Sequence, residues 1–392
     1  MLEVTIAVAS DLHCAPGHTS SDSYLTTEMP LRPISHHPVR SLLKLIRDKK
    51  LRTNVLVVPG DVTNKADLLG LRMGWEHARA IRSALKARHV IATLGNHEIY
   101  REAEPPADPL SIAKDAHDEF PVSGESAKEQ YWNRCFCIKS FAYAAYVTLN
   151  TVPLSDGAQA TGGGGVSGEC LDAMDRELAN LKDAPFRIAV CHHHPIGHDD
   201  VGQSPQDLME NADKLLELLG KHRFDLVIHG HKHYPRLRVA STGGGPIAVL
   251  AAGSLSAVLD RRLATRTRNT FHVVRLERES KGTTCRGMIT TWEFHLESEW
   301  KPASKTSADL PHESGFGSAT APDQLAAKVA ASMEASRANE FWDDIVAKNP
   351  DVQYLDEGQR ASFDQTLRDQ YRMEVEPPSE RPRRISRLKG DA

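Results

Sequence analysis

The feature that most constrains the fold is a regular alternation of short apolar runs with segments of helical periodicity. Residues 4–10, 54–58 and 90–94 are short apolar runs typical of buried strands. The segments between them, 38–49 and 67–86, repeat apolar residues every three to four positions, as an amphipathic helix does. This alternation predicts an α/β architecture.

The same pattern continues along the chain until the composition changes after residue 277. Further strands are expected at 143–150, 186–191, 226–229, 247–252, 271–277 and 288–295, and further helices at 167–182 and 206–220. The helix at 167–182 begins at a typical N-cap residue, Ser167. We therefore predict a main domain over residues 1–277.

Residues 278–392 are predicted to form a C-terminal extension that is mainly helical. Residues 300–320 are rich in Ser, Pro and Lys, which is typical of a linker. Helical periodicity returns at 322–348 and 358–372. The Pro- and Arg-rich end, 376–392, is predicted to be disordered.

Composition and charge argue against several classes of protein. The net charge of −4 gives no overall signature of a nucleic-acid-binding protein. The six cysteines include no CxxC pair and form no disulfide framework, so a reducing compartment is expected. The N-terminus lacks the basic region of a signal peptide, and no apolar run approaches the ~20 residues that span a bilayer. We expect a cytoplasmic protein with no membrane partner; its oligomeric state is left open.

Five short polar segments follow predicted strands and carry most of the Asp, Asn and His residues of interest. They are Asp11-Leu12-His13, Gly60-Asp61, Gly95-Asn96-His97-Glu98, Cys191-His192-His193-His194-Pro195 and Gly230-His231-Lys232-His233. Ligand sites of open α/β sheets lie at the carboxyl ends of the strands. The five segments are therefore expected to converge on one site.

The residue types in these segments suit divalent metal ions. Carboxylate and amide oxygens bind hard cations, and imidazole binds Zn, Mn, Fe and Ni. Alternate residues of an extended segment share a face, so Asp11 and His13 can turn toward one ion. Glycines before Asp61, Asn96 and His231 allow unusual backbone angles and close approach of a ligand. Each segment alone is weak evidence, but the ordered set is specific.

The order D-x-H, G-D, G-N-H-E, H-x-P, G-H-x-H resembles that of the calcineurin-like metallophosphoesterase superfamily, over about residues 1–275. The resemblance implies a double β-sheet sandwich flanked by helices, with a dinuclear metal site between the loop ends of the sheets. Residues 1–277 would then be the catalytic domain.

The resemblance also implies a role for each matching residue. Asp11, His13 and His233 would bind one metal ion, and Asn96, His193 and His231 the other. Asp61 would bridge the two ions. His97 would be a catalytic acid or a stabiliser of the transition state rather than a ligand. His193 is selected because the ligand of the family usually stands two residues before the proline, and His192 could take its place.

Such a pair of ions, whether Mn, Fe, Zn or Ni, would lower the pKa of a bound water, and the resulting hydroxide would attack phosphorus. The segment 60–64 and the region 167–181 look like the class III cyclic-nucleotide phosphodiesterase branch. A phosphodiesterase acting on a nucleotide-type or other small phosphodiester is therefore the first hypothesis.

The sequence is also compatible with a nuclease, a phosphomonoesterase or a non-catalytic scaffold. The run from His231 to Pro235, followed by Gly253-Ser254, is similar to the end of the core in DNA-repair nucleases of the superfamily. A nucleic acid is nevertheless the less favoured substrate, because charge runs such as that around Arg261 are usually solvated faces. The complete ligand set disfavours the scaffold.

Overall fold

The structure, a computed structural model, describes residues 1–17, 22–28, 33–100, 108–152, 164–197, 208–281, 283–304, 310–334, 336–377 and 382–388. Within these residues the strands form two large sheets and one small one. The first large sheet has the strand order β12-β11-β10-β1-β2-β3, with β13 paired to β11. The second has the order β4-β5-β6-β7-β9-β8.

The strands of the first sheet come from two distant parts of the chain. They are β1 (Leu2–Val8), β2 (Val55–Val58), β3 (His89–Ala92), β10 (Asn269–Arg278), β11 (Arg286–His295), β12 (Glu299–Pro302) and β13 (Glu313–Phe316). Those of the second sheet are β4 (Phe136–Ser140), β5 (Ala145–Leu149), β6 (Arg187–Val190), β7 (Leu226–His229), β8 (Arg236–Thr242) and β9 (Gly245–Ala251). Strands β1, β2 and β3 are parallel to one another, as are β5, β6, β7 and β9.

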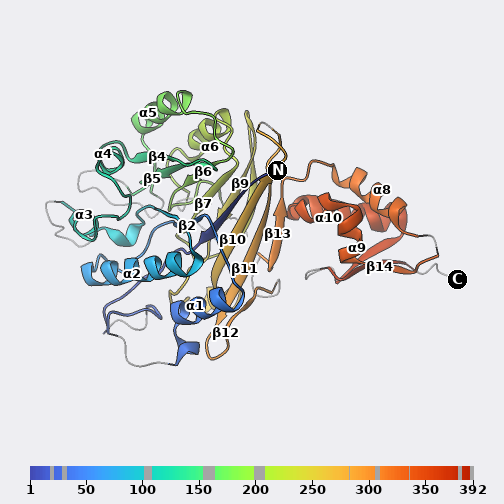
Figure 1. Ribbon diagram of the computed structural model, residues 1–392, viewed down its shortest axis with the longest axis horizontal. Coiled ribbons are helices and arrows are strands. Elements are labelled where there is room, and N and C mark those ends of the chain that lie inside the picture. The colour runs from blue at the N-terminus through green and yellow to red at the C-terminus, as the bar shows by residue number, and fades with distance from the viewer. Residues whose placement is uncertain are drawn as a thin grey trace.

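The helices cover the outer faces of the two sheets. They are α1 (Pro38–Asp48), α2 (Leu68–Leu85), α3 (Ser111–Asp115), α4 (Glu125–Arg134), α5 (Gly168–Ala179), α6 (Ala212–Lys221) and α7 (Arg261–Ala264). Figure 1 shows α1 and α2 on one side of the molecule and α5 and α6 on the other, with the sheets between them. The α/β sandwich expected from the sequence is confirmed.

The apolar alternation of the strands explains how the sheets pack. In β1, Val4, Ile6 and Val8 lie in the core between the two sheets, whereas Ala7 belongs to the core beneath α1 and α2. In β6, Ile188 and Val190 likewise face the first sheet. Successive side chains of a strand point to opposite faces, so each strand contributes to two hydrophobic layers.

Local capping fixes the ends of the helices. Ser167 Oγ accepts a hydrogen bond from the Cys170 N–H at 3.1 Å, which confirms the predicted N-cap of α5. The Asp67 side chain caps α2, which ends at Lys86 in the left-handed conformation (φ 55°). These ends place the loops that precede and follow the strands carrying the polar segments.

The domain boundary predicted at 277/278 divides a β-hairpin. It falls within β10, and β10 pairs with β11 from Asn269 opposite Phe294 to Glu277 opposite Arg286. The polar residues after β10 form the turn of this hairpin rather than a linker. The expected linker, 300–320, also contains most of β12 and all of β13, and both strands pair with β11. The first sheet therefore extends to Phe316.

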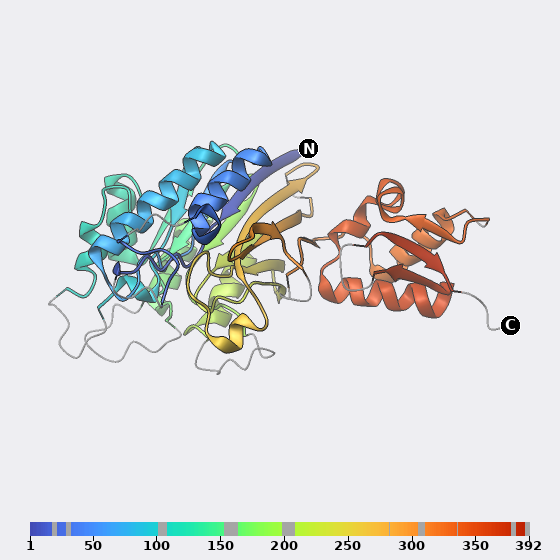
Figure 2. The same ribbon diagram turned by 90° about the horizontal axis from the view of Figure 1, so that it is seen from below.

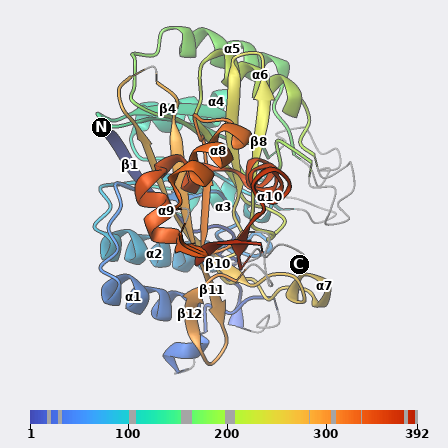
Figure 3. The same cartoon turned by 90° about the vertical axis from the view of Figure 1, so that its right-hand side faces the viewer.

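The remaining C-terminal residues form a small unit with its own core, at one end of the long axis of the molecule (Figures 2 and 3). Its elements are α8 (Pro322–Ser332), β14 (Asn339–Phe341), α9 (Trp342–Lys348), η6 (Pro350–Tyr354), α10 (Glu357–Tyr371), β15 (Met373–Glu376) and β16 (Arg384–Arg387). The three strands form a sheet of order β14-β16-β15.

This unit is mainly helical, as the sequence predicted, but it also contains a small sheet that the sequence did not predict. The helix expected at 322–348 is interrupted by β14, and the tail expected to be disordered contributes β16. Both strands are very short, and each is stabilised by its partner strand rather than by a local pattern. Residues 378–381 and 389–392 of the tail lie outside the described residues. No helix in the described part of the chain is long and apolar enough to span a bilayer.

Candidate metal centre

The five polar segments lie just after the carboxyl ends of neighbouring strands. Asp11 and His13 follow β1, Asp61 follows β2, and Asn96 begins the short helix η3 (Asn96–Glu98) after β3. In the second sheet the triple-histidine segment follows β6, and the segment beginning at Gly230 follows β7. Because the two sheets are packed face to face, the segments converge on one site from both of them.

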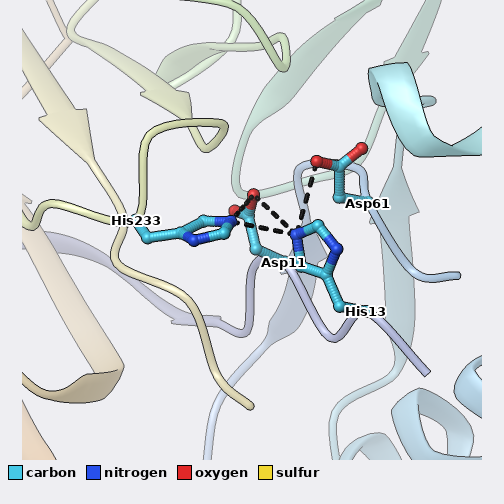
Figure 4. A group of neighbouring side chains, drawn as sticks. All are labelled: Asp11, His13, Asp61 and His233. Carbon is cyan, nitrogen blue, oxygen red and sulfur yellow. Dashed lines mark hydrogen bonds and ion pairs between the residues drawn. The ribbon is translucent and has the colours of Figure 1, made fainter. Parts of the chain in front are cut away.

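Four of the predicted ligands form a first cluster (Figure 4): Asp11, His13, Asp61 and His233. The Nε2 atoms of His13 and His233 lie 2.9 Å apart. His233 Nε2 is 3.4 Å from Asp11 Oδ1, and His13 Nε2 is 3.5 Å from Asp61 Oδ2. Both carboxylates are buried. Two imidazoles and two carboxylates thus point toward a common centre.

A second cluster, of Asp61, His192 and His231, shares the Asp61 carboxylate with the first. His192 Nε2 lies 3.2 Å from Asp61 Oδ2 and 3.2 Å from Asn96 Oδ1. His231 Nε2 is buried and makes no hydrogen bond to any described residue. A buried ring nitrogen without a hydrogen bond is costly unless something else binds it.

The structure places His192, rather than the predicted His193, in the second cluster. His193 Nδ1 lies 2.8 Å from the Thr151 hydroxyl, and its ring packs against that of His231 with the centroids 4.7 Å apart. After β6 the chain leaves the strand geometry, so the spacing to Pro195 does not determine which side chain faces Asp61. The sequence alone left both histidines open.

The backbone at this site adopts conformations that non-glycine residues rarely take. Positive φ angles occur at Asp11 (51°), His13 (47°), Asp61 (51°), His231 (88°) and His233 (58°). Such conformations cost of the order of 1–3 kcal/mol each and tend to cluster at functional sites. These positive φ angles are concentrated in the candidate ligands. The gain from placing the side chains at the site therefore exceeds the cost of the unfavourable backbone conformation.

Two glycines allow the segments to approach one another closely. A Cβ atom on Gly230 would collide with the Ser10 hydroxyl and the Asp11 carboxylate. A Cβ atom on Gly95 would meet Asp61, with the backbone nitrogen of that residue 2.6 Å away. The glycines noted in the sequence are therefore required by contact between segments.

Glu98 holds two of these segments together, a role that the sequence did not reveal. Its Oε2 accepts hydrogen bonds from the backbone N–H groups of Asp61 (2.9 Å) and Gly95 (2.7 Å), and its Oε1 accepts from Thr63 (3.0 Å). Burial, reinforced by the Asp61 charge, raises the pKa of Glu98 to about 7. The sequence feature that could have indicated this role is the position of the Glu98 carboxylate directly after the candidate residues Asn96 and His97.

His97 lies at the partly exposed edge of the first cluster. Its ring meets that of His13 edge to face, with the centroids 4.5 Å apart. Its Nδ1 accepts the Lys65 backbone N–H at 3.3 Å, and burial lowers its pKa to about 4. The ring is therefore neutral, with its hydrogen on Nε2. The His97 backbone N–H donates to Asp61 Oδ1 at 2.8 Å, which couples its position to the shared carboxylate.

The electrostatics of the shared carboxylate favour bound cations. Burial opposes ionisation of Asp61, but the charge of His192 outweighs it and holds the pKa of Asp61 well below its usual range. Burial also opposes protonation of His192, yet the Asp61 and Asp11 charges raise its pKa to about 9. The buried carboxylates of Asp11 and Asp61 are therefore stabilised by positive charge placed beside them.

The donor set and the buried His231 nitrogen fit a dinuclear site for divalent ions. Carboxylates and imidazoles of this kind bind Mn, Fe, Zn and Ni. One carboxylate common to both clusters is what a bridging ligand requires.

Comparison with known proteins identifies the family. The sequence profile described as calcineurin-like phosphoesterase matches residues 4–235, which is more than half of the 392-residue chain. The chain therefore belongs to the calcineurin-like phosphoesterase family, as the motif order indicated. The family supports a metal-dependent phosphoester hydrolase.

A curated relative is the probable cyclic nucleotide phosphodiesterase of Xenorhabdus bovienii (strain SS-2004), 24% identical over 187 residues. The match covers 47% of this chain and 62% of the relative, which is less than two thirds of its length.

Solved structures matched by this chain include the purple acid phosphatase from yellow lupin (Lupinus luteus) seeds. It is 12% identical, with a TM-score of 0.47, over 76% of this chain and 53% of that one. The phosphopantetheinyl hydrolase from Mycobacterium tuberculosis is 15% identical, with a TM-score of 0.34, over 64% of this chain and 90% of that one.

Proposed function

We propose that the protein is a dinuclear metal-dependent phosphodiesterase. The observation that carries the proposal is the Asp61 carboxylate, which is common to both clusters of metal-binding side chains. Asp11, His13 and His233 would hold one ion, Asn96, His192 and His231 the other, and Asp61 both. His193 would hold the ring of His231 in place by packing against it.

Two bound divalent ions would supply Lewis acidity toward phosphoryl oxygens and a water of lowered pKa. The residues of the chain position these ions and the substrate. Glu98 fixes the backbone of the Asp61 and Gly95 loops, so that the ligands are held before the substrate arrives.

His97 is the group of this chain placed to donate a hydrogen bond to the substrate, because its ring is neutral and keeps its one hydrogen. With Nδ1 accepting from Lys65, its Nε2–H is the available donor. A hydrogen-bond donor aimed at the charge that develops in the transition state is typically worth about 10²–10³-fold.

The substrate we propose is a small phosphodiester of the nucleotide type. Its support is the likeness of residues 60–64 and 167–181 to the class III cyclic-nucleotide phosphodiesterases, together with the name of the Xenorhabdus relative. We propose that the protein acts in the cytoplasm.

Hydrolysis of bis-p-nitrophenyl phosphate and p-nitrophenyl phosphate, with Mn²⁺ added and with metal chelated, tests this function. We expect metal-dependent turnover with the diester preferred. Preference for the monoester would replace the proposal with a phosphomonoesterase, and steep inhibition of DNA cleavage by salt would favour a nuclease.

A further inference from the structure

A second polar site lies at the opposite edge of the sandwich from the metal centre. A cavity of about 330 Å³ is bordered by the C-terminal ends of α5 and α6, by the first residue of β6, Arg187, and by the last residue of β10, Arg278. The candidate ligands follow the other end of β6, whose four residues span about 13 Å. The cavity is therefore separate from the metal centre.

The cavity has four cationic side chains in its wall: Arg187, Lys221, Arg223 and Arg278. Arg278 is paired with Asp225, and Lys221 lies 2.8 Å from Asp175. Asp183, the other acidic residue of the wall, lies 3.4 Å from Lys281 outside it.

Arg187 and Arg223 form no ion pair with a carboxylate among the residues that the structure describes. The Arg187 guanidinium donates instead to the His222 carbonyl, at 2.8 Å. Two positive charges therefore remain without a direct ion pair among the described residues, and that of Arg187 interacts with Asp225 at longer range. The carbonyl ends of α5 and α6 offset part of that charge, since a helix C-terminus carries about half a negative charge.

Arg278 supplies a second, independent observation. Its side chain is only 10% exposed and stacks over the Phe186 ring, with the guanidinium carbon 5.0 Å from the centroid. Its Nε–H is buried and makes no hydrogen bond to any described residue. Because that nitrogen is closed to solvent, Arg278 contributes to the cavity its charge and a position supported by Phe186, and no accessible donor at Nε.

We propose that this cavity binds the phosphate group of a small organic phosphate. Arginines are suited to phosphate because their planar guanidinium donates two parallel hydrogen bonds. Leu178, Leu181 and Ala184 give the cavity an apolar wall for the rest of the ligand. Its volume lies at the lower end of the range for small-molecule pockets, roughly 300–1,000 Å³, and suits a ligand of mononucleotide size.

Isothermal titration calorimetry of the full chain with AMP, inorganic phosphate and adenosine tests the site. EDTA is present, so that binding through divalent ions is suppressed. The test variant is the double substitution Arg187→Gln with Arg223→Asn, the asparagine being chosen because Arg223 has a φ of 54° and Asn tolerates that region. The matched control is Arg52→Gln, which removes an exposed arginine that, like the half-buried Arg187, donates to a backbone carbonyl.

We expect AMP to bind the wild type and the control equally, and the double variant about tenfold to a hundredfold more weakly. Inorganic phosphate should compete with AMP. Binding of inorganic phosphate alone would keep the anion site and assign it to free phosphate. Equal binding of adenosine and AMP, unchanged affinity in the double variant, or no binding of AMP or phosphate at millimolar concentration would each overturn the proposal.

Discussion

The two edges of the sandwich use buried charge in opposite ways. At the carboxyl ends of the strands, Asp11 and Asp61 are buried together with imidazoles, and the residues that carry these groups have positive φ angles. At the opposite edge, Asp225 is paired with Arg278 and accepts a backbone hydrogen bond from Arg187. The buried carboxylates of the first edge require positive charge from bound cations. The buried carboxylate of the second edge is neutralised by an arginine of the chain itself.

This difference teaches where substitutions should affect catalysis and where they should affect stability. Removing a group at the metal centre should lower turnover while the fold persists, because the strands that carry the segments are stabilised by their own cores. Removing a charge from the opposite edge should destabilise the fold and leave the turnover of folded molecules unchanged.

The substitution Asp61→Ala should have the largest effect on turnover. Because the carboxylate belongs to both clusters, its loss should lower kcat/KM by more than about 10³-fold, beyond the effect of removing one transition-state donor. Diester hydrolysis at saturating Mn²⁺ measures this, with the exposed Asp48→Asn as control. Turnover within tenfold of wild type would contradict the role of Asp61.

Substitution of His192 and of His193 should separate a ligand from its neighbour. His192→Ala should reduce metal affinity and activity nearly as much as Asp61→Ala, because its Nε2 faces Asp61. His193→Ala should cost about 10–100-fold, as supporting residues of metal sites do. Metal titrations followed by activity compare them, and the reverse order of effects would restore His193 as the ligand.

The substitution His97→Ala should lower kcat by about 10²–10³-fold, because a hydrogen-bond donor to the transition state is lost, and leave the metal content unchanged. The physical reason is that its Nε2–H faces away from Lys65, while its backbone bond to Asp61 is kept in the variant. Steady-state kinetics and elemental analysis of the same samples measure both quantities. Loss of metal together with activity would show that His97 is itself a ligand.

The substitution Glu98→Gln should have an intermediate effect, of about 10–100-fold on kcat/KM. An amide has one acceptor oxygen in place of two, so it cannot accept from Asp61, Gly95 and Thr63 as the carboxylate does. The control is Glu76→Gln, which alters an exposed pair with Arg79. Unchanged kinetics in Glu98→Gln would mean that the loops are held without this clamp.

The substitution Arg278→Gln should have the smallest effect on turnover and a clear effect on stability. It leaves Asp225, whose side chain is 11% exposed, without its paired cation, and breaking such buried pairs costs about 3–5 kcal/mol. Urea unfolding measures the change, and Arg79→Gln in an exposed pair should change the free energy of unfolding far less. A large fall in kcat with unchanged stability would erase the contrast between the two edges.

The sequence predicted the central strands and the convergence of the polar segments well. Strands such as β1 and β6 are buried on both faces, so an apolar run marks them, and the residue after such a run lies at the edge where ligands gather. The strands β14 and β16 carry no comparable run, because they depend on pairing between distant segments. Their strand conformation is determined by tertiary contacts, so the local sequence pattern could not predict it.

The side chains that face the site were predictable as a set but not one by one. Five of the predicted ligands have a backbone conformation that no rule of spacing anticipates. The choice between His192 and His193 turns on the path of the chain after β6, and the role of Glu98 on backbone groups of another segment. Contacts between segments settle these details.

The most direct test of the shared carboxylate is the number of metal ions bound per chain, measured by native mass spectrometry after loading with Mn²⁺. We predict two ions in the wild type and loss of at least one in Asp61→Ala, with the charge-state distribution of the folded chain unchanged. Two ions retained in Asp61→Ala, or a single ion in the wild type, would contradict a dinuclear site built around Asp61.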